Sequence, residues 1–223
     1  MIRSYTDIQE SYLKIDQDVQ NCQSAYIVIW KRLFDVIIAF LVTLLILIWF
    51  IPIVGLLIKL TSPGPIIFIQ WRTGLNGRPF RCFKFRTMVY NNQSVTFKQT
   101  IYNDPRITPI GSWLRKTNLD EMPQFLNVLI GTMSVVGPRP HALQHDAEFW
   151  FQLSDYHKRY TVLPGITGLA QIRGARGITD DVKKMDQRLK YDLLYIEKSS
   201  FWHDAQICIW TLKLMFFGDP NAW

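Results

Sequence analysis

The stretch KRLFDVIIAFLVTLLILIWFIPIVGLLIKLTSPGP, from Lys31 to Pro65, decides how the chain is organised. Between Val36 and Ile58 it carries no charged residue. A helix needs about 20 predominantly apolar residues to cross the hydrocarbon core of a membrane, so this run is long enough for a span. A single transmembrane helix is therefore the simplest interpretation.

Two features of the same stretch favour a helix that enters the membrane, bends, and leaves on the side from which it came. Pro52 lies inside the run, and an interior proline removes a helical hydrogen bond and kinks the helix. Basic residues flank both ends, and such flanks favour the cytoplasmic side. We predict a re-entrant helix over residues 31–60 with its break at Pro52, while charge and proline alone leave the plain span open. The flanking basic residues are Lys31, Arg32, Lys59, Arg72, Arg78 and Arg81.

The composition indicates an anionic partner at a membrane surface. The chain has 223 residues, a formal net charge of +7 and 48 % apolar residues, with fourteen Phe and eight Trp. A basic balance suits nucleic acid, anionic lipid or a phosphorylated substrate. The Arg and Lys residues stand singly among apolar ones, without the basic helix or tail of a nucleic-acid binder, so we expect no nucleic acid. Three separated cysteines without a CxxC pair argue against a disulfide framework and a zinc site.

The chain is predicted to contain a polar N-terminal extension (residues 1–30), the membrane helix (31–60) and a catalytic region (61–223). The runs IIFIQW and FRCFKFRTM, separated by RTGLNGRP, predict a β-hairpin. Alternation along the second run puts Lys84 and Arg86 on one face, as a solvated face or as a clamp for phosphate. Residues 141–163 read as an amphipathic helix. A last helix begins near Ser200, and its Trp202 and Trp210 suit a membrane interface.

Two adjacent carboxylates stand in KTNLDEMPQFLNVL, from Lys116 to Leu129. Pro123 is tolerated only in the first turn of a helix, so Asp120 and Glu121 lie at or just before a helix start. Acids are common there because the helix dipole stabilises them, and for the pair alone this explanation suffices. The alternative is a phosphoryl-transfer site, in which Asp120 is a nucleophile and Glu121 an oxygen ligand for Mg²⁺. Basic residues that could neutralise a phosphate are Lys84, Arg86, Arg115 and Arg139.

Several motifs, in a fixed order from Lys31 to the end, resemble the bacterial sugar transferases. These are the small monotopic polyprenyl-phosphate phosphoglycosyl transferases. The matching pieces are KRLFD, SPGPIIFIQWRTGLNGRPFRCFKFRTM, LRKTNLDEMPQFLNVLIGTMSVVGPRP and PGITGLAQIRG. The resemblance implies an α+β, mainly helical, monotopic membrane protein with a re-entrant helix-break-helix, a small hairpin and interfacial amphipathic helices.

The resemblance also implies a reaction. Such proteins transfer a sugar 1-phosphate from a UDP-sugar to undecaprenyl phosphate, at the cytoplasmic face of the bacterial inner membrane, and release UMP. Asp120 matches the aspartate that forms a covalent phosphosugar intermediate, and Glu121 matches the glutamate tied to Mg²⁺. Arg115 matches an arginine that contacts phosphate. Lys84 and Arg86 fall in the basic strand, and Arg139 falls in the Pro-Arg-Pro turn near the nucleotide.

Two parts of the chain depart from, or refine, that pattern. The family often has Ser-Pro at the helix break, where this chain has Ile51 and Pro52. The run RGARGITDDVKKMDQRLKYDL and the ending NAW look like members that handle glucose or galactose 1-phosphate. Those members often carry an extra N-terminal membrane region, whereas shorter members often use N-acetylated sugars.

Two other functions are weighed against this one. A membrane-anchored basic interaction module would explain the charge and the apolar segments, but not Asp120 beside Glu121. A direct metal-dependent glycosyltransferase would act without a covalent step. Such enzymes tend to carry an Asp-x-Asp metal motif. In this chain that pattern occurs only at Asp16 and Asp18, in the polar N-terminal extension, and not near Asp120.

Overall fold

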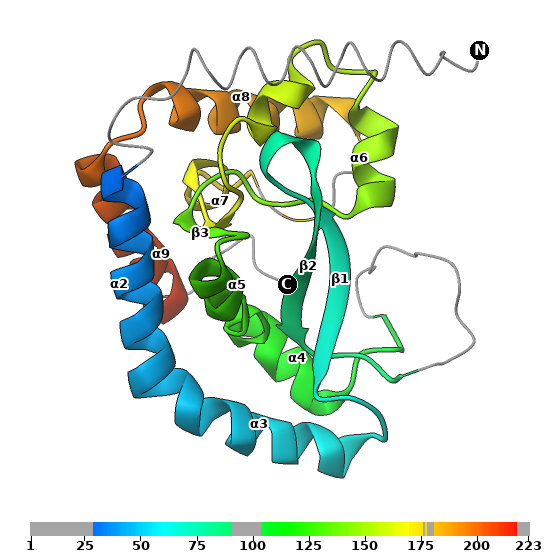
Figure 1. Cartoon of the computed structure of the whole chain (residues 1–223). Coiled ribbons are helices and arrows are strands. Elements are labelled where there is room, and N and C mark those ends of the chain that lie inside the picture. Colours follow the sequence, from blue (N-terminus) through cyan, green and yellow to red (C-terminus); the bar gives the residue numbers. More distant parts are fainter. Residues whose placement is uncertain (1–28, 91–103, 176, 178–180, 218–223) are drawn as a thin grey trace.

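The apolar segment is helical throughout but changes direction within its length. In the computed structural model, α2 (Lys31–Val42) leads through a π-helical turn (Thr43–Leu47) into α3 (Ile48–Thr61). Figure 1 shows α3 running at a wide angle to α2. The structure describes residues 29–90, 104–175, 177 and 181–217. Most of the predicted N-terminal extension and the ending NAW lie outside these residues.

The sequence predicts a break at Pro52, and the irregular turn of the helix comes shortly before that residue. Pro52 is inside α3, and the irregular turn ends at Leu47, before it. A proline ring crowds the carbonyl four residues earlier, here that of Ile48, and cannot bond to it. The distortion therefore falls on the N-terminal side of the proline, next to the π-helical turn.

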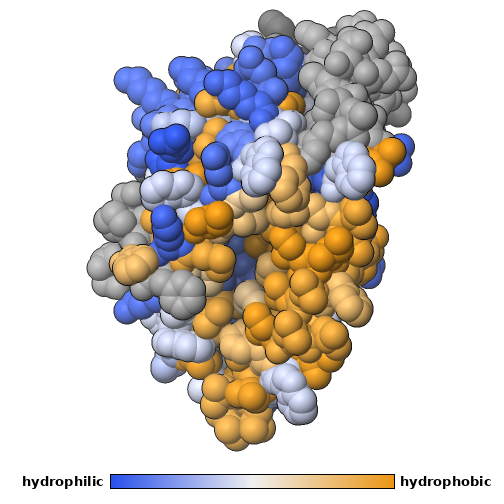
Figure 2. Space-filling model, turned by 90° about the vertical axis from the view of Figure 1, so that its left-hand side faces the viewer, coloured by the Kyte–Doolittle hydropathy of each residue, from blue (hydrophilic) through white to orange (hydrophobic). Residues whose placement is uncertain are grey.

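The outer face of α2 and α3 is apolar and exposed. The stretch Lys31–Thr61 is the one helix in the described part of the chain that is long and apolar enough to cross a membrane, and little of it is buried. Figure 2 shows a continuous apolar surface over this side of the molecule. Because a protein in water would bury such a surface, we read it as lipid-facing. Its large exposed side chains include Ile37, Phe40, Leu45, Trp49, Ile53, Leu56 and Leu60.

The start of α2 is attached to the rest of the protein by polar contacts. Lys31 Nζ lies 2.7 Å from Asp204 Oδ2, and both side chains are buried. Arg32 donates to the carbonyl of Val128 at 2.8 Å. Asp35 Oδ1 accepts hydrogen bonds from Ser134 Oγ and from the Val135 amide, each at 2.9 Å. The polar residues of KRLFD thus anchor the membrane helix.

The far end of α3 is attached to the same body. The guanidinium of Arg86 donates to the carbonyls of Ser62 at 2.7 Å and Pro63 at 2.6 Å, just after the last turn of α3. Gly64 has a φ of 124°, and a side chain there would collide with Arg86. Both ends of the bent helix are therefore held by one folded unit.

The predicted hairpin is confirmed. Strands β1 (Ile67–Thr73) and β2 (Pro79–Phe85) pair antiparallel, with Gln70 opposite Cys82. A 3₁₀ turn (Leu75–Gly77) joins them, and Asn76 adopts a φ of 54° there. The Arg81 guanidinium lies 5.2 Å from the centre of the Trp71 ring, a cation–π contact across the two strands.

The remaining chain is mainly helical and surrounds a small parallel pair of strands. Strand β3 (Ser134–Val136) pairs with β4 (Gly165–Thr167). Around them lie the short or irregular helices α4 (Pro109–Lys116), Leu119–Glu121, α5 (Gln124–Ile130), α6 (Leu143–Phe149), Tyr156–Tyr160 and α7 (Leu169–Ile172). The longer α8 (Val182–Glu197) and α9 (Phe201–Phe217) follow.

One predicted helix is wrong, and another is confirmed. Residues 141–163 do not form a single amphipathic helix, because α6 ends at Phe149 and a 3₁₀ turn follows at Tyr156–Tyr160. In this break the Trp150 and Tyr160 rings stack, and the Tyr156 ring meets both of them edge to face. This packing replaces the regular helix. The last helix forms as predicted, with Trp202 and Trp210 exposed.

Candidate active site

The two acids occupy a tight turn that precedes α5. Asn118 takes a left-handed conformation, with φ 56°, and ends the preceding helical stretch. Asp120 and Glu121 then lie in the 3₁₀ turn Leu119–Glu121, and α5 begins at Gln124. The position predicted from Pro123 is confirmed. Asn127 on α5 accepts from the Phe83 amide at 2.9 Å and donates to the Arg81 carbonyl at 2.7 Å, which fixes this turn beside β2.

Glu121 is held by two cations from other elements. Lys84 on β2 lies 2.5 Å from Oε1 of Glu121. Arg139, which follows β3, donates to Oε2 at 2.8 Å and also contacts Oε1. Burial by itself would raise the pKa of Glu121, but Arg139 and Lys84 hold it well below its usual value. Glu121 is therefore ionised at neutral pH.

Asp120 has a different environment from its neighbour. In the described part of the chain, no group donates a hydrogen bond to its carboxylate. Burial raises the pKa of Asp120 above its usual value, the nearby charge of Lys84 lowers it, and the charge of Glu121 raises it further. A carboxylate without donors keeps its lone pairs free for attack. Opposite shifts of two neighbouring acids are typical of a site in which each has its own role.

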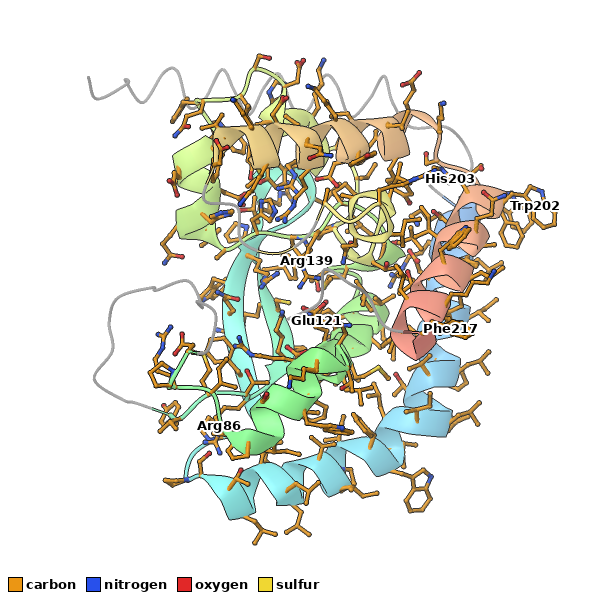
Figure 3. The ribbon with its side chains drawn as sticks, turned by 180° about the vertical axis from the view of Figure 1, so that it is seen from behind. Arg86, Glu121, Arg139, Trp202, His203 and Phe217 are labelled. Carbon is orange, nitrogen blue, oxygen red and sulfur yellow. The ribbon has the colours of Figure 1, made fainter. Side chains whose placement is uncertain are left out.

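The other predicted phosphate-binding residues divide into two groups. Arg115 donates to Thr87 Oγ1 at 2.8 Å; burial lowers its pKa, and the nearby Asp120 charge opposes this. It therefore belongs to the cluster. Arg86 does not join Lys84, because its guanidinium is taken up by carbonyls at the end of α3. Figure 3 shows Glu121 and Arg139 near each other, with Arg86 well apart.

Sequence reasoning missed the side chains that hold the Arg139 turn. Arg72 on β1 donates to the Pro140 carbonyl at 2.5 Å. Arg159 donates to the Arg139 carbonyl at 2.8 Å and pairs with Asp192 at the same distance. Burial lowers the pKa of Arg72. A basic residue beside the Pro-Arg-Pro run could have been noticed in the sequence. Arg72 and Arg159 come from distant segments, so no local sequence pattern links them to this turn.

The residues present fit a divalent cation only together with a substrate. Among the described residues, no group of three His, Cys, Asp or Glu side chains is arranged so that it could hold a metal ion by itself. Mg²⁺ is often held by one or two carboxylates, with phosphate oxygens and water completing its six ligands. Asp120 and Glu121 meet that requirement. Because Lys84 and Arg139 occupy the Glu121 oxygens, a bound cation would have to share these oxygens or displace one of the two.

Removing the charge of Lys84 should move the acid limb of the pH–activity profile. For Asp120 as the predicted nucleophile, the reactive form is the carboxylate, so activity should fall as the pH falls through its pKa. Lys84 lowers that pKa, so Lys84→Met should shift the limb to higher pH. The profile of kcat/KM against pH reports this shift independently of any loss in rate. Lys116→Met removes the same charge from an exposed position and should leave the acid limb at its wild-type pH. An acid limb at the same pH in both variants would contradict the assignment.

Comparison with known proteins places the chain among relatives of one kind. Residues 26–218 match the family model described as bacterial sugar transferase. The chain is 46 % identical over 185 residues to UDP-glucose:undecaprenyl-phosphate glucose-1-phosphate transferase of Escherichia coli (strain K12), covering 82 % of this chain and 39 % of that protein. The protein of the same name from Caulobacter vibrioides is 44 % identical over 196 residues, 86 % of this chain and 72 % of its own length.

A further relative is matched over almost its whole length. Exopolysaccharide production protein PSS of Rhizobium leguminosarum bv. phaseoli is 47 % identical over 186 residues, 82 % of this chain and 92 % of that protein. The chain spans about two fifths of the Escherichia coli relative. The family match covers most of the chain, and the acids, Lys84, Arg115 and Arg139 lie within it. This chain belongs to the bacterial sugar transferase family.

Proposed function

We propose that the chain transfers a sugar 1-phosphate from a UDP-sugar to undecaprenyl phosphate, giving undecaprenyl-diphosphate-sugar and UMP. The observation that carries the proposal is the paired environment of the acids. Asp120 has a carboxylate to which no described group donates, and Glu121 beside it is ionised between Lys84 and Arg139. A nucleophile next to cations that neutralise phosphate oxygens is what phosphoryl transfer needs.

The proposed reaction has two balanced steps. First, an Asp120 oxygen attacks the β-phosphorus of the UDP-sugar and forms an acyl phosphate bond. The bond from that phosphorus to the bridging oxygen breaks, and UMP leaves with the electron pair. Second, a phosphate oxygen of undecaprenyl phosphate attacks the same phosphorus, which forms the diphosphate and releases the Asp120 carboxylate.

The basic residues have distinct roles in this proposal. Lys84 and Arg139 both contact Glu121. When the diphosphate of the UDP-sugar enters, they would bind its oxygens in place of Glu121. Arg115, whose charge acts on Asp120, would stabilise the charge that develops on the phosphoryl group. Mg²⁺, held by Glu121, Asp120 and the diphosphate, would supply further charge neutralisation. Arg86 has a structural role here and is left out of the phosphate site.

The donor sugar is proposed from the relatives. The Escherichia coli and Caulobacter vibrioides proteins are named for glucose 1-phosphate, and the Streptococcus agalactiae relative is called galactosyl transferase CpsE. An Aeromonas hydrophila relative, 38 % identical, is named for N-acetylgalactosamine. We favour UDP-glucose or UDP-galactose, and a role at the start of surface polysaccharide assembly.

A panel of UDP-sugars tests the function. Purified protein, undecaprenyl phosphate and Mg²⁺ should release UMP with UDP-glucose or UDP-galactose. Release of UDP in place of UMP would indicate a direct glycosyltransferase. No release with any sugar of the panel would favour a membrane-anchored interaction module.

We further propose that the bent helix is re-entrant and that the site faces the cytoplasm at the inner membrane. The attachment of both of its ends to one folded unit supports this. A full span would place Lys31 and Arg86 on opposite sides of the bilayer, and their partners could not then belong to one body. The arrangement would hold Asp120 at a fixed height relative to the acceptor phosphate.

Cysteine labelling tests this topology. In a chain whose native Cys22, Cys82 and Cys208 are replaced, single cysteines at Gln23 and Arg78 should both resist a membrane-impermeant thiol reagent in intact cells. Both should react after permeabilisation. Arg78 is exposed in the hairpin loop, whereas neighbouring Asn76 has a left-handed backbone that a cysteine would strain. Labelling of position 23 in intact cells, with position 78 protected, would show a true span.

A further inference from the structure

A cavity lies apart from the acids, where α7, α8 and α9 meet. Its volume is about 340 Å³, and none of the residues of the Asp120 cluster lines it. Figure 3 shows His203 near the start of α9, away from Glu121 and Arg139. The lining residues are Leu169, Arg173, Tyr191, Leu194, Lys198 and His203.

The charge of this cavity is one-sided. Arg173 and Lys198 are exposed, and neither side chain has an ion-pair or hydrogen-bond partner in the described part of the chain. No carboxylate lines the cavity. The two residues end α7 and α8, and helix dipoles favour cations at such ends. That preference explains each charge separately, but not why both line one hollow with an apolar wall.

The cavity lies close to the start of the apolar helix. His203 precedes Asp204, whose carboxylate is bound to Lys31 at the start of the apolar helix. The His203 ring also donates to the Lys198 carbonyl at 3.1 Å, which ties α9 to α8 at this point. Trp30 and Trp202, on the two helices, are 63 % and 75 % exposed. Exposed tryptophans at helix ends are typical of the headgroup region of a bilayer.

We propose that this cavity binds the phosphate group of an anionic membrane phospholipid. Arg173 and Lys198 would contact the phosphate, and Leu169, Tyr191 and Leu194 would contact the glycerol and the first methylene groups. The free ring nitrogen of His203 would face the headgroup hydroxyls. The bound lipid would steady the height and tilt of the protein. It is separate from the acceptor at Asp120, and the proposal does not depend on the transfer reaction.

Lipid titration of the full chain in a neutral detergent tests this. The probes are short-chain phosphatidylglycerol, phosphatidylcholine and inorganic phosphate, with binding followed by intrinsic tryptophan fluorescence. The wild type should bind phosphatidylglycerol most tightly. The double variant Arg173→Gln/Lys198→Gln should bind it at least about tenfold more weakly, since a basic residue near an anionic lipid contributes about fivefold.

A matched variant distinguishes lipid binding in the cavity from a general effect of the net charge of the protein. Lys183→Gln/Lys190→Gln removes two charges from exposed positions on α8 outside the cavity and should retain wild-type affinity. Equal weakening in both double variants would overturn the proposal, because only net charge would then matter. Inorganic phosphate binding as tightly as phosphatidylglycerol would also overturn it, in favour of a soluble anion. UMP release by all variants reports the transfer reaction separately.

Discussion

Asp120→Asn should abolish UMP release while the protein remains folded. The substitution keeps the volume of the side chain but removes the charge that attacks phosphorus. Loss of a nucleophile typically lowers the rate by about 10⁴-fold or more. No described group donates to the Asp120 carboxylate, so few contacts change. The measurement is UMP release at saturating UDP-sugar, with thermal unfolding as the check on folding.

A covalent intermediate would identify Asp120 directly. Wild-type protein given UDP-sugar without acceptor should gain the mass of a phosphosugar on the peptide that contains Asp120. The control Asp155→Asn makes the same change on the partly exposed surface, where Asp155 pairs with Lys158, and should behave as wild type. Near-normal turnover by Asp120→Asn would refute the assignment.

Glu121→Gln should lower activity by about 10²- to 10³-fold and raise the Mg²⁺ concentration needed for half-maximal rate. A neutral amide is a poorer ligand for Mg²⁺ and no longer pairs with Lys84 and Arg139. The side chains of this cluster are 13 % to 26 % exposed, so the ion pairs are largely buried. Removing one partner of such a pair also costs about 3 kcal/mol of stability.

The pH dependence separates the two effects of this substitution. The folded pKa of Glu121 is depressed, so its stabilising contribution is present above its unfolded value and is lost as the pH falls towards the folded one. The difference in Tm between wild type and Glu121→Gln should therefore shrink in acid. Glu148→Gln, the same change at an exposed position, should alter neither Tm nor Mg²⁺ dependence. An unchanged Mg²⁺ dependence in Glu121→Gln would remove Glu121 from the metal site.

Short-range features of this protein could be predicted from its sequence. The hairpin follows from aromatic and β-branched runs around a Gly/Asn turn, and the place of the acids follows from Pro123, because both depend on neighbours in the chain. The long apolar helix follows from its composition. The single helix expected over residues 141–163 fails because its aromatic side chains pack against one another and against Met185 and Leu189 of α8, and this tertiary packing overrides local periodicity.

The sequence by itself determined the apolar segment and the residues proposed to carry the chemistry, which are the adjacent acids and the cations around them. Only the tertiary structure decided which partner each of the cations binds. Alternation put Lys84 and Arg86 on one face, yet Lys84 reaches Glu121 while Arg86 closes the end of α3. β2 ends at Phe85, so the strand alternation no longer governs Arg86. Partners of a cation are chosen by whichever charges and carbonyls the fold brings near, and those come from segments far apart in sequence.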